Sequence, residues 1–585
     1  MRRGVRTSRP TAVRRSPVAA RPPRVARGSS ARAHSGNDSS GSHAAGSRPT
    51  GHDCAQDNIG HSRIVSVDVR LCALMVHRRG QTESVQVEAV RTTGIYCRAE
   101  CAAQPLAHNV SQYSHPAAAE AAGFRACLRC HPERRAGSLA DLDVPAPVQA
   151  ALLRISDGFL DNADESALAA CVGYSARQLR RLFERHVGAT PTAIARSRRA
   201  HFARCLIDDT DLTFGQIARA AGFGGARQLH RAMTSVFCFT PTELRVKRRA
   251  GARPRLDGGL VLSVPYLAPF AFTAFLQHQS ARIIPGVEDV AADAAAAGRC
   301  AAGSYVRSFR ACGHPGVAEL YAAPPADDDR LQLRLHLPTY DSIMDAVSRC
   351  RAMLGADEDP AAAHAALADD PLIGALVRQA PGLRVPRSWD RFETAVRIVV
   401  GQQISLKAAS TMCSRIARRF GTHFDALGAC CEDRHVPVTF LFPDAEQLAC
   451  AGRERLAALG FTRRRSDTVV GLAEAVASGV VDLGAADSLA DTVAQLCELP
   501  GIGPWTAHLI AMRVYGHHDA FPAADLGLRR AAERLVGQRL DAAGLEALAE
   551  PWRPYRAWAA QHLWRSGTIV SPTRTDVLPD PKGST

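Results

Sequence analysis

Four cysteines have the spacing of a metal site. Cys97 and Cys101 are separated by three residues, Cys127 and Cys130 by two, and some 25 residues lie between the pairs. Two close pairs suit one tetrahedral zinc ion, because each pair in a turn can present two thiolates to the same metal. A zinc-bound thiol is deprotonated, and the thiolate is the nucleophilic form of cysteine. The spacing therefore predicts a Zn2+ site, with a plain structural zinc knuckle as the alternative to a reactive one.

A second pattern near the C-terminal end combines a glycine hairpin with a carboxylate. The segment Leu499-Pro-Gly-Ile-Gly503 precedes Pro504, Trp505 and Thr506, and Asp525 follows Trp505 by twenty residues. Glycines permit a tight turn and close backbone approach, and amides at a helix start can bind a DNA phosphate. We therefore expect Gly501, Gly503 and Thr506 to contact DNA. The alternative for Asp525 is an ordinary helix N-cap.

The middle of the chain contains a duplicated helical pattern. Residues 165–185 predict a helix, a turn at Gly173 and a basic second helix capped by Ser175, and residues 213–231 repeat the pattern with Gly222 at the turn. Two such units with basic second helices fit successive major grooves of DNA. The candidate DNA contacts are Arg177, Arg180, Arg181, Arg227 and His230. A solvated basic helix face is the alternative for each of them.

These two regions together resemble the Ada-type adaptive-response regulators. The motifs Ala89-Val-Arg-Thr-Thr-Gly-Ile-Tyr-Cys97 and Ala121-Ala-Gly-Phe-Arg-Ala-Cys127 match the zinc domain of that family, although residues 80–88 depart from its usual pattern. The helical doublet, which ends in Phe239-Thr-Pro-Thr-Glu-Leu-Arg245, is similar to AraC-type DNA-binding domains. The resemblance implies that the four cysteines bind zinc and that Cys97 accepts a methyl group from a DNA methylphosphotriester.

The C-terminal half resembles the AlkA-type DNA-3-methyladenine glycosylases of the helix-hairpin-helix superfamily. The hairpin with its downstream aspartate carries this resemblance, together with Val400-Gly-Gln-Gln-Ile-Ser405 and a Pro265-Tyr segment. It implies that Asp525 is catalytic and that Trp505 and Trp564 line the base pocket. Bifunctional relatives have a lysine at the position of Trp505, so we expect no strand cleavage through that residue.

Two pocket positions depart from well-known members of the glycosylase family. A pocket tyrosine of some relatives corresponds to Leu509, and a leucine that enters the DNA minor groove corresponds to Gln403. We expect both residues to contact the substrate. The first departure concerns the range of lesions, and the second concerns how the gap in the duplex is filled after the base leaves.

These patterns predict a mainly α multidomain protein. A disordered basic tail (1–60) precedes a small α+β zinc domain (61–140), an all-α double helix-turn-helix domain (148–248), an α+β AlkA-type N-terminal domain (260–372) and an all-α helix-hairpin-helix domain (373–572). The net charge is +15, but residues 1–50 contain eleven Arg and one acid, so the rest of the chain is only weakly basic. That charge alone is weak support for DNA binding.

The predicted function is a bifunctional alkylation-response protein: a monofunctional DNA glycosylase fused to a methylphosphotriester-sensing transcription regulator. Alkylated DNA and promoter DNA are the expected partners, with RNA polymerase as a further one. We expect no membrane contact, since no segment approaches the roughly 18 apolar residues of a span, and we expect a bacterial cytoplasmic, nucleoid-associated location. Two alternatives are a regulator with a catalytically silent glycosylase half, and a glycosylase whose front half is only a DNA tether. The Pro-Cys-His-Arg motif of methylguanine transferases is absent, so repair of O6-methylguanine is not expected.

Overall fold

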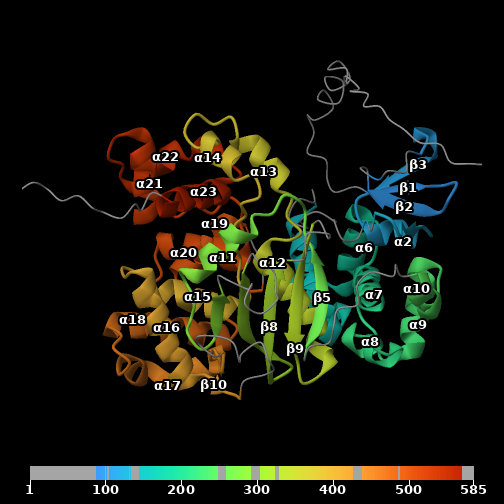
Figure 1. Cartoon of the computed structure of the whole chain (residues 1–585), viewed down its shortest axis with the longest axis horizontal. Helices are drawn as coiled ribbons and strands as arrows, with labels where there is room; N and C mark the ends of the chain where they lie inside the picture. Colours follow the sequence, from blue (N-terminus) through green and yellow to red (C-terminus); the bar gives the residue numbers. More distant parts are fainter. Residues whose placement is uncertain are drawn as a thin grey trace, which may run out of the picture. The chain divides into compact units, whose positions relative to one another are not determined.

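The computed structural model describes residues 87–98, 101, 105–130, 132, 144–247, 259–291, 303–322, 329–425, 438–484 and 488–569. The predicted tail (1–60) and the predicted zinc domain before residue 87 lie outside the described residues. The chain divides into two compact units, residues 1–77 and 78–585, and every described element belongs to the second (Figure 1). None of the helices described here combines the length and the hydropathy that a membrane span requires.

The first described domain is a small sheet with one helix. Its strands have the order β3-β1-β2-β4, with β2 and β4 parallel and the other neighbours antiparallel. The elements are β1 (Val87–Val90), β2 (Ile95–Arg98), β3 (Val110–Tyr113), α2 (Pro116–Ala121) and β4 (Arg125–Ala126). Gly94, with φ +64°, closes the turn between β1 and β2, where a left-handed backbone favours glycine. The predicted small α+β domain is confirmed.

The next segment is entirely helical, as expected. Its helices are α3 (Ala146–Ser156), α4 (Phe159–Asn162), α5 (Glu165–Cys171), α6 (Ala176–His186), α7 (Pro191–Asp209), α8 (Phe214–Ala220), α9 (Ala226–Phe237) and α10 (Pro241–Lys247). Gly173 (φ +76°) and Gly222 (φ +71°) occupy the two turns. The predicted N-cap at Ser175 is confirmed, since its side chain accepts from the Gln178 amide in a reciprocal capping box.

An antiparallel five-stranded sheet of order β5-β9-β8-β7-β6 begins the second half. Its strands are β5 (Leu260–Pro265), β6 (Glu288–Ala291), β7 (Ser304–Ala311), β8 (His314–Ala322) and β9 (Arg330–His336). In β9, Leu331, Leu333 and Leu335 are buried in the core, and Arg334 and His336 are buried as well. Helices α11 (Phe272–Ser280) and α12 (Ile343–Leu354) contribute Phe275 and Met353 to the same core, which makes this part α+β as predicted.

The rest of the described chain is mainly helical and surrounds two cores. The helices are α13 (Pro360–Leu367), α14 (Gly374–Gln379), α15 (Arg391–Val400), α16 (Leu406–Phe420), α17 (Ala445–Ala457), α18 (Arg463–Ala477), α19 (Leu489–Cys497), α20 (Pro504–Ile510), the π-helical η6 (Ala511–Tyr515), α21 (Leu526–Val536), α22 (Ala542–Leu548) and α23 (Arg556–Ile569). A short β10–β11 pair (Thr422–His423 and Phe440–Leu441) joins α16 to α17. One core lies among α15 to α20, and the other joins α13 and α14 to α21 and α23. Helical packing therefore begins at α13, before residue 373.

Candidate active site and metal centre

Asp525 caps the first turn of α21. Its Oδ1 accepts from the backbone amide of Leu528 at 2.9 Å, and its backbone is extended as an N-cap requires. The N-cap interpretation is thus correct as local geometry. The carboxylate can accept further hydrogen bonds, because each of its oxygens can accept more than one.

Two tryptophans supply the remaining hydrogen bonds to this carboxylate. Nε1 of Trp505, on α20, donates to Asp525 Oδ2 at 3.1 Å, and Nε1 of Trp564, on α23, donates to Oδ1 at 3.0 Å. Hydrogen bonds to an ionised acceptor are stronger than neutral ones. Three helices separated in the sequence therefore hold one partly buried carboxylate between two indole rings, in a fixed orientation.

The hairpin before α20 depends on glycine at one position more than at the other. Gly501 has φ +88°, and a Cβ built on it would lie 1.9 Å from the side-chain oxygen of Thr468 on α18. Gly503 is the N-cap of α20 with φ −100°, and a Cβ there would meet nothing within 4 Å. Gly501 is therefore required by the fold, whereas Gly503 only keeps the outer side of the hairpin open.

A glutamine from the loop after α15 holds the hairpin in place. Nε2 of Gln402 donates to the carbonyl of Gly501 at 3.0 Å and to the hydroxyl of Thr506 at 2.9 Å. Thr506 is only 3 % exposed. The hydroxyl of Thr506 faces Gln402 and is covered, so it supports the hairpin from within, and a contact of Thr506 with DNA stays a prediction.

The other two expected substrate-binding residues, Gln403 and Leu509, lie on the loop after α15 and on α20. Gln403 is exposed and has φ +56°, a left-handed backbone that is uncommon for a residue other than glycine. Such strain persists only where the surroundings impose it, and it is frequent at functional loops. Leu509 lies on α20, four residues after Trp505, and is partly exposed.

Two arginines and one glutamine of this region were missed by the sequence analysis. Gln402 is described above, Arg282 follows α11, and Arg513 lies in η6 directly after α20. The guanidinium of Arg513 lies over the ring of Trp564, 5.3 Å from its centroid. Arginine is common throughout this chain, so nothing in the local sequence distinguishes these two from surface residues.

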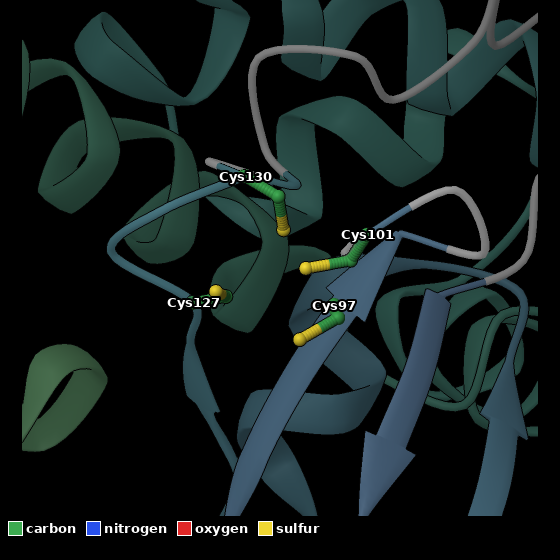
Figure 2. A group of neighbouring side chains, drawn as sticks. All are labelled: Cys97, Cys101, Cys127 and Cys130. Carbon is green, nitrogen blue, oxygen red and sulfur yellow. The ribbon is translucent and has the colours of Figure 1, made fainter. Parts of the chain in front are cut away.

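The four cysteines converge at one point (Figure 2). Cys97 lies on β2, Cys101 follows that strand, and Cys127 and Cys130 follow β4, so parallel pairing of β2 with β4 brings the two pairs together. The four sulfur atoms lie within 4.8 Å of one another. A tetrahedral site with Zn–S bonds of about 2.3 Å needs sulfur separations of about 3.8 Å, so a small contraction suffices.

The protonation of these thiols also favours a bound cation. A hydrogen bond with Cys130 and burial raise the pKa of Cys97, whereas the hydrogen bond with Cys97 lowers the pKa of Cys130 to about 5. Thiols this close compete for the ionised form, and a divalent cation removes that competition because it binds thiolates. The donor set and its geometry fit zinc.

The helix-turn-helix candidates lie on α6 and α9. Arg177, Arg181, Arg227 and His230 are exposed on these second helices. Arg180 is exposed too, but its guanidinium forms an ion pair with Glu165 of α5, at 2.9 Å. Arg180 therefore already has a partner within the domain, and the other four are better placed to reach DNA.

Four family models match the chain in succession. They are the metal binding domain of Ada (residues 71–133), a helix-turn-helix domain (168–247), the AlkA N-terminal domain (261–390) and the HhH-GPD superfamily of base excision DNA repair proteins (396–554). The predicted fold class and the fusion of two halves are thereby confirmed.

Known proteins match most of the chain and parts of each half. A protein of Mycobacterium tuberculosis named "Probable bifunctional transcriptional activator/DNA repair enzyme AlkA" is 41 % identical over 484 residues, which cover 82 % of this chain and 92 % of that protein. DNA-3-methyladenine glycosylase 2 of Escherichia coli is 27 % identical over 296 residues, 51 % of this chain and 94 % of that protein. The bifunctional transcriptional activator/DNA repair enzyme Ada of the same bacterium is 34 % identical over 160 residues, 27 % of this chain and 44 % of that protein.

Proposed function

Since the chain belongs to the family of bifunctional transcriptional activator/DNA repair enzymes AlkA, we propose that its glycosylase half excises alkylated bases of the 3-methyladenine type, with Asp525 as the catalytic residue. The chain joins an Ada-type zinc-binding domain and a helix-turn-helix domain to a DNA glycosylase domain. The observation that carries the proposal is the carboxylate of Asp525, held between the indole N–H groups of Trp505 and Trp564.

The chemistry of base excision explains why a fixed carboxylate is needed. The damaged nucleotide must leave the base stack before an enzyme can reach its glycosidic bond. Cleavage of that bond builds oxocarbenium-like positive charge on the sugar, as in other glycoside hydrolyses. A carboxylate that is already oriented stabilises this charge without reorganisation, and it can orient the attacking water. The three hydrogen bonds to Asp525 supply that orientation.

The residues around Asp525 fit the remaining steps. Trp505 and Trp564 offer indole faces on which an extruded base can stack. Trp505 has no amine, so the enzyme is monofunctional and leaves an intact abasic strand. The hairpin at Gly501 and Gly503 contacts the DNA backbone, and Gln403, exposed on its strained loop, enters the duplex where the base has left.

An excision assay with a panel of lesions tests this proposal. The full-length protein is incubated with duplexes that contain 3-methyladenine, 7-methylguanine, 1,N6-ethenoadenine or hypoxanthine, and free base is quantified. We expect base release with strands that break only after alkali treatment. If no base is released from any duplex, the half that contains Asp525 only binds DNA. Strand cleavage without alkali would contradict the monofunctional mechanism.

For the front half we propose a zinc-dependent methyl acceptor at Cys97. Cys97, Cys101, Cys127 and Cys130 would hold one zinc ion, which supplies the charge that keeps their sulfurs ionised. The sulfur of Cys97 attacks the methyl carbon of a methylphosphotriester, the carbon–oxygen bond breaks, and an ordinary phosphodiester anion leaves. The sulfur thereby becomes a neutral thioether, and the site loses one negative charge, which favours contact with DNA phosphates.

Helices α6 and α9 of the helix-turn-helix domain would then bind promoter DNA, and the bound protein would recruit RNA polymerase. This regulation would take place on chromosomal DNA in the bacterial cytoplasm.

Duplexes with a labelled methylphosphotriester test this half of the proposal. The label should appear on Cys97 in mass spectra, and methylated protein should bind promoter DNA more tightly. Cys171 is exposed on α5 and away from the cluster, so Cys171→Ser serves as a control that retains transfer. Label on Cys171, or equal promoter affinity before and after transfer, would overturn the sensor function.

A further inference from the structure

The loop that carries Asp525 is bound by the same two helices that present tryptophans to its carboxylate. This loop, residues 516–525, joins η6 to α21. Trp505 lies on α20 and Trp564 on α23, and each indole N–H donates to the carboxylate. Each helix also binds the loop at a second point, before Asp525 in the sequence.

The second contact of α23 is an ion pair between Arg556 and Asp519. Nε of Arg556 donates to Oδ1 of Asp519 at 2.8 Å, and Nη2 donates to Oδ2 at 2.9 Å. Nη2 also donates to the backbone carbonyl of Asp519 at 3.0 Å. The amide of Ala557 donates to the carbonyl of His518 at 2.8 Å. Two parallel bonds to one carboxylate fix a relative orientation as well as a distance.

The second contact of α20 is made by His508. Its Nδ1 accepts from the backbone amide of Phe521 at 3.3 Å. An accepting nitrogen carries no proton, and burial, followed by the charge of Arg556, lowers the pKa of His508. Residues three apart on a helix lie on the same side of it, and His508 follows Trp505 by three. Helix α20 therefore holds the loop at Phe521 and the carboxylate at Asp525.

The ion pair is not what attaches the loop to the protein. Phe521 is only 2 % exposed, and its ring packs edge-on against Trp552 with the centroids 6.1 Å apart. Burial of this apolar side chain supplies the attraction. Arg556 is 3 % exposed, and for a buried ion pair the cost of desolvation offsets much of the Coulomb attraction. The pair between Asp519 and Arg556 therefore contributes orientation more than stability.

Helix α23 connects this ion pair to the proposed base pocket. Arg556 is its first residue, and Trp564 follows eight residues later, about 12 Å along the helix axis. Consecutive backbone hydrogen bonds make the helix stiff over that length, so the attachment of Arg556 sets where the indole of Trp564 lies relative to Asp525. A misplacement of about 1 Å at a reacting group can cost roughly 100-fold in rate.

We propose that Asp519 is a positioning residue of the glycosylase, which through Arg556 fixes the loop against α23 so that the carboxylate of Asp525 meets the indole N–H of Trp564. The pair keeps the distance of 3.0 Å between Nε1 of Trp564 and Oδ1 of Asp525. The inference rests on the glycosylase function proposed above, and it adds a residue that acts through others and not on the reacting atoms.

Single-turnover excision from duplexes with 3-methyladenine tests the proposal, with the full-length protein in excess over DNA. Asp519→Asn keeps the shape of the side chain and one acceptor oxygen, but its amide Nδ2 cannot accept the second bond from Arg556. We expect the maximal rate constant to fall about tenfold, and the protein concentration at half-saturation to stay within about twofold of wild type. With protein in excess, the maximal rate constant does not depend on the fraction that is folded.

A double-mutant cycle distinguishes positioning from general support of the fold. In the Trp564→Phe background the bond from α23 to the carboxylate is already absent, so Asp519→Asn should cost no more than about twofold further. In the Trp505→Phe background the bond from Trp564 remains, and the loss should again be about tenfold. Arg553→Gln is the control: Arg553 is an exposed partner of the same carboxylate and precedes α23, so the rate constant should stay within about twofold of wild type.

Equal losses from Asp519→Asn in the wild-type and Trp564→Phe backgrounds would overturn the proposal and leave Asp519 as a structural residue. An unchanged rate constant in Asp519→Asn would overturn it too. If Asp519→Asn does not fold, Arg556→Lys, which keeps the charge but loses the paired donors, takes its place in the same cycle with the same expectations. If the wild-type protein releases no 3-methyladenine, the glycosylase function itself fails, which is a separate result.

Discussion

Replacement of Gly501 by alanine should unfold the hairpin that precedes α20. The new methyl group would lie 1.9 Å from Thr468 Oγ1 and 3.0 Å from Thr468 Cβ, and the backbone would have to remain at φ +88°. Thr468 is 4 % exposed and its hydroxyl donates to the carbonyl of Arg464, so it cannot simply rotate away. The carbonyl of Gly501 would also shift from Gln402, which donates to it.

The size of the effect follows from these contacts. A left-handed backbone costs a residue with a Cβ about 1–2 kcal/mol, and overpacking of a buried side chain costs about 1–3 kcal/mol. We therefore expect Gly501→Ala to destabilise the glycosylase half by about 3 kcal/mol. For a domain of this size that is roughly 6–12 °C in Tm. Affinity for duplex DNA should fall as well, because the hairpin no longer presents its amides.

Thermal unfolding and DNA binding of matched variants measure the loss of stability and the loss of DNA affinity in Gly501→Ala. Gly503→Ala is the control, because its Cβ would meet nothing within 4 Å and its φ is −100°, so it should lose only the N-cap preference of glycine over alanine, less than about 1 kcal/mol. The double variant Gly501→Ala/Thr468→Ala removes the oxygen that clashes and should regain the steric part of the loss, but not the backbone part. Equal stability of Gly501→Ala and wild type, or equal losses in Gly501→Ala and Gly503→Ala, would refute the reasoning.

Three further predictions concern other parts of the chain. Gln402→Ala removes the hydrogen bonds of 3.0 Å and 2.9 Å to Gly501 and Thr506. The free energy of unfolding measured in urea should fall by about 1–2 kcal/mol. An unchanged free energy of unfolding would show that Gln402 does not stabilise the hairpin. Burial, and then Arg565, lower the pKa of His562 to about 4 from 6.5. As the pH falls, the unfolded chain therefore takes up a proton at His562 before the folded chain does. The free energy of unfolding should fall by up to about 3 kcal/mol between pH 6.5 and 4, and less steeply in His562→Gln. Identical pH profiles of the two proteins would contradict a buried, neutral His562. Cys101→Ser should lose the bound zinc in metal analysis, and retention of a full equivalent would show that Cys101 is not a ligand.

The sequence predicted those features that depend on local patterns. The turn glycines at 173 and 222 and the cap at Ser175 are short-range signals, and each is present in the structure. The four cysteines were recognisable for the same reason, since their spacing restricts them to two turns. Asp525, Trp505 and Trp564 were named from a family motif, and the structure brings them within hydrogen-bonding distance.

Features that depend on packing between distant segments were not predictable. The hydrogen bond from Gln402 to the hydroxyl of Thr506 joins residues that are 104 positions apart in the sequence. Arg180 was expected on a free basic face, but Glu165 on the preceding helix pairs with it. The contact of Arg513 with the ring of Trp564 likewise joins residues that are 51 positions apart in the sequence. No periodicity or spacing encodes such contacts.

The most direct test of the account is the release of 3-methyladenine by Asp525→Asn under single-turnover conditions. Asparagine also serves as an N-cap, and its oxygen can keep the hydrogen bonds from Leu528 and Trp564, so α21 should be retained. Loss of the negative charge removes the group that stabilises the developing cation, and we predict a rate at least about 100-fold below wild type. DNA affinity should stay within error of wild type, whereas Tm should fall by about 2–4 °C, because the amide Nδ2 of asparagine cannot accept the hydrogen bond from Trp505. Release of the base by Asp525→Asn within a few-fold of the wild-type rate would contradict the central claim.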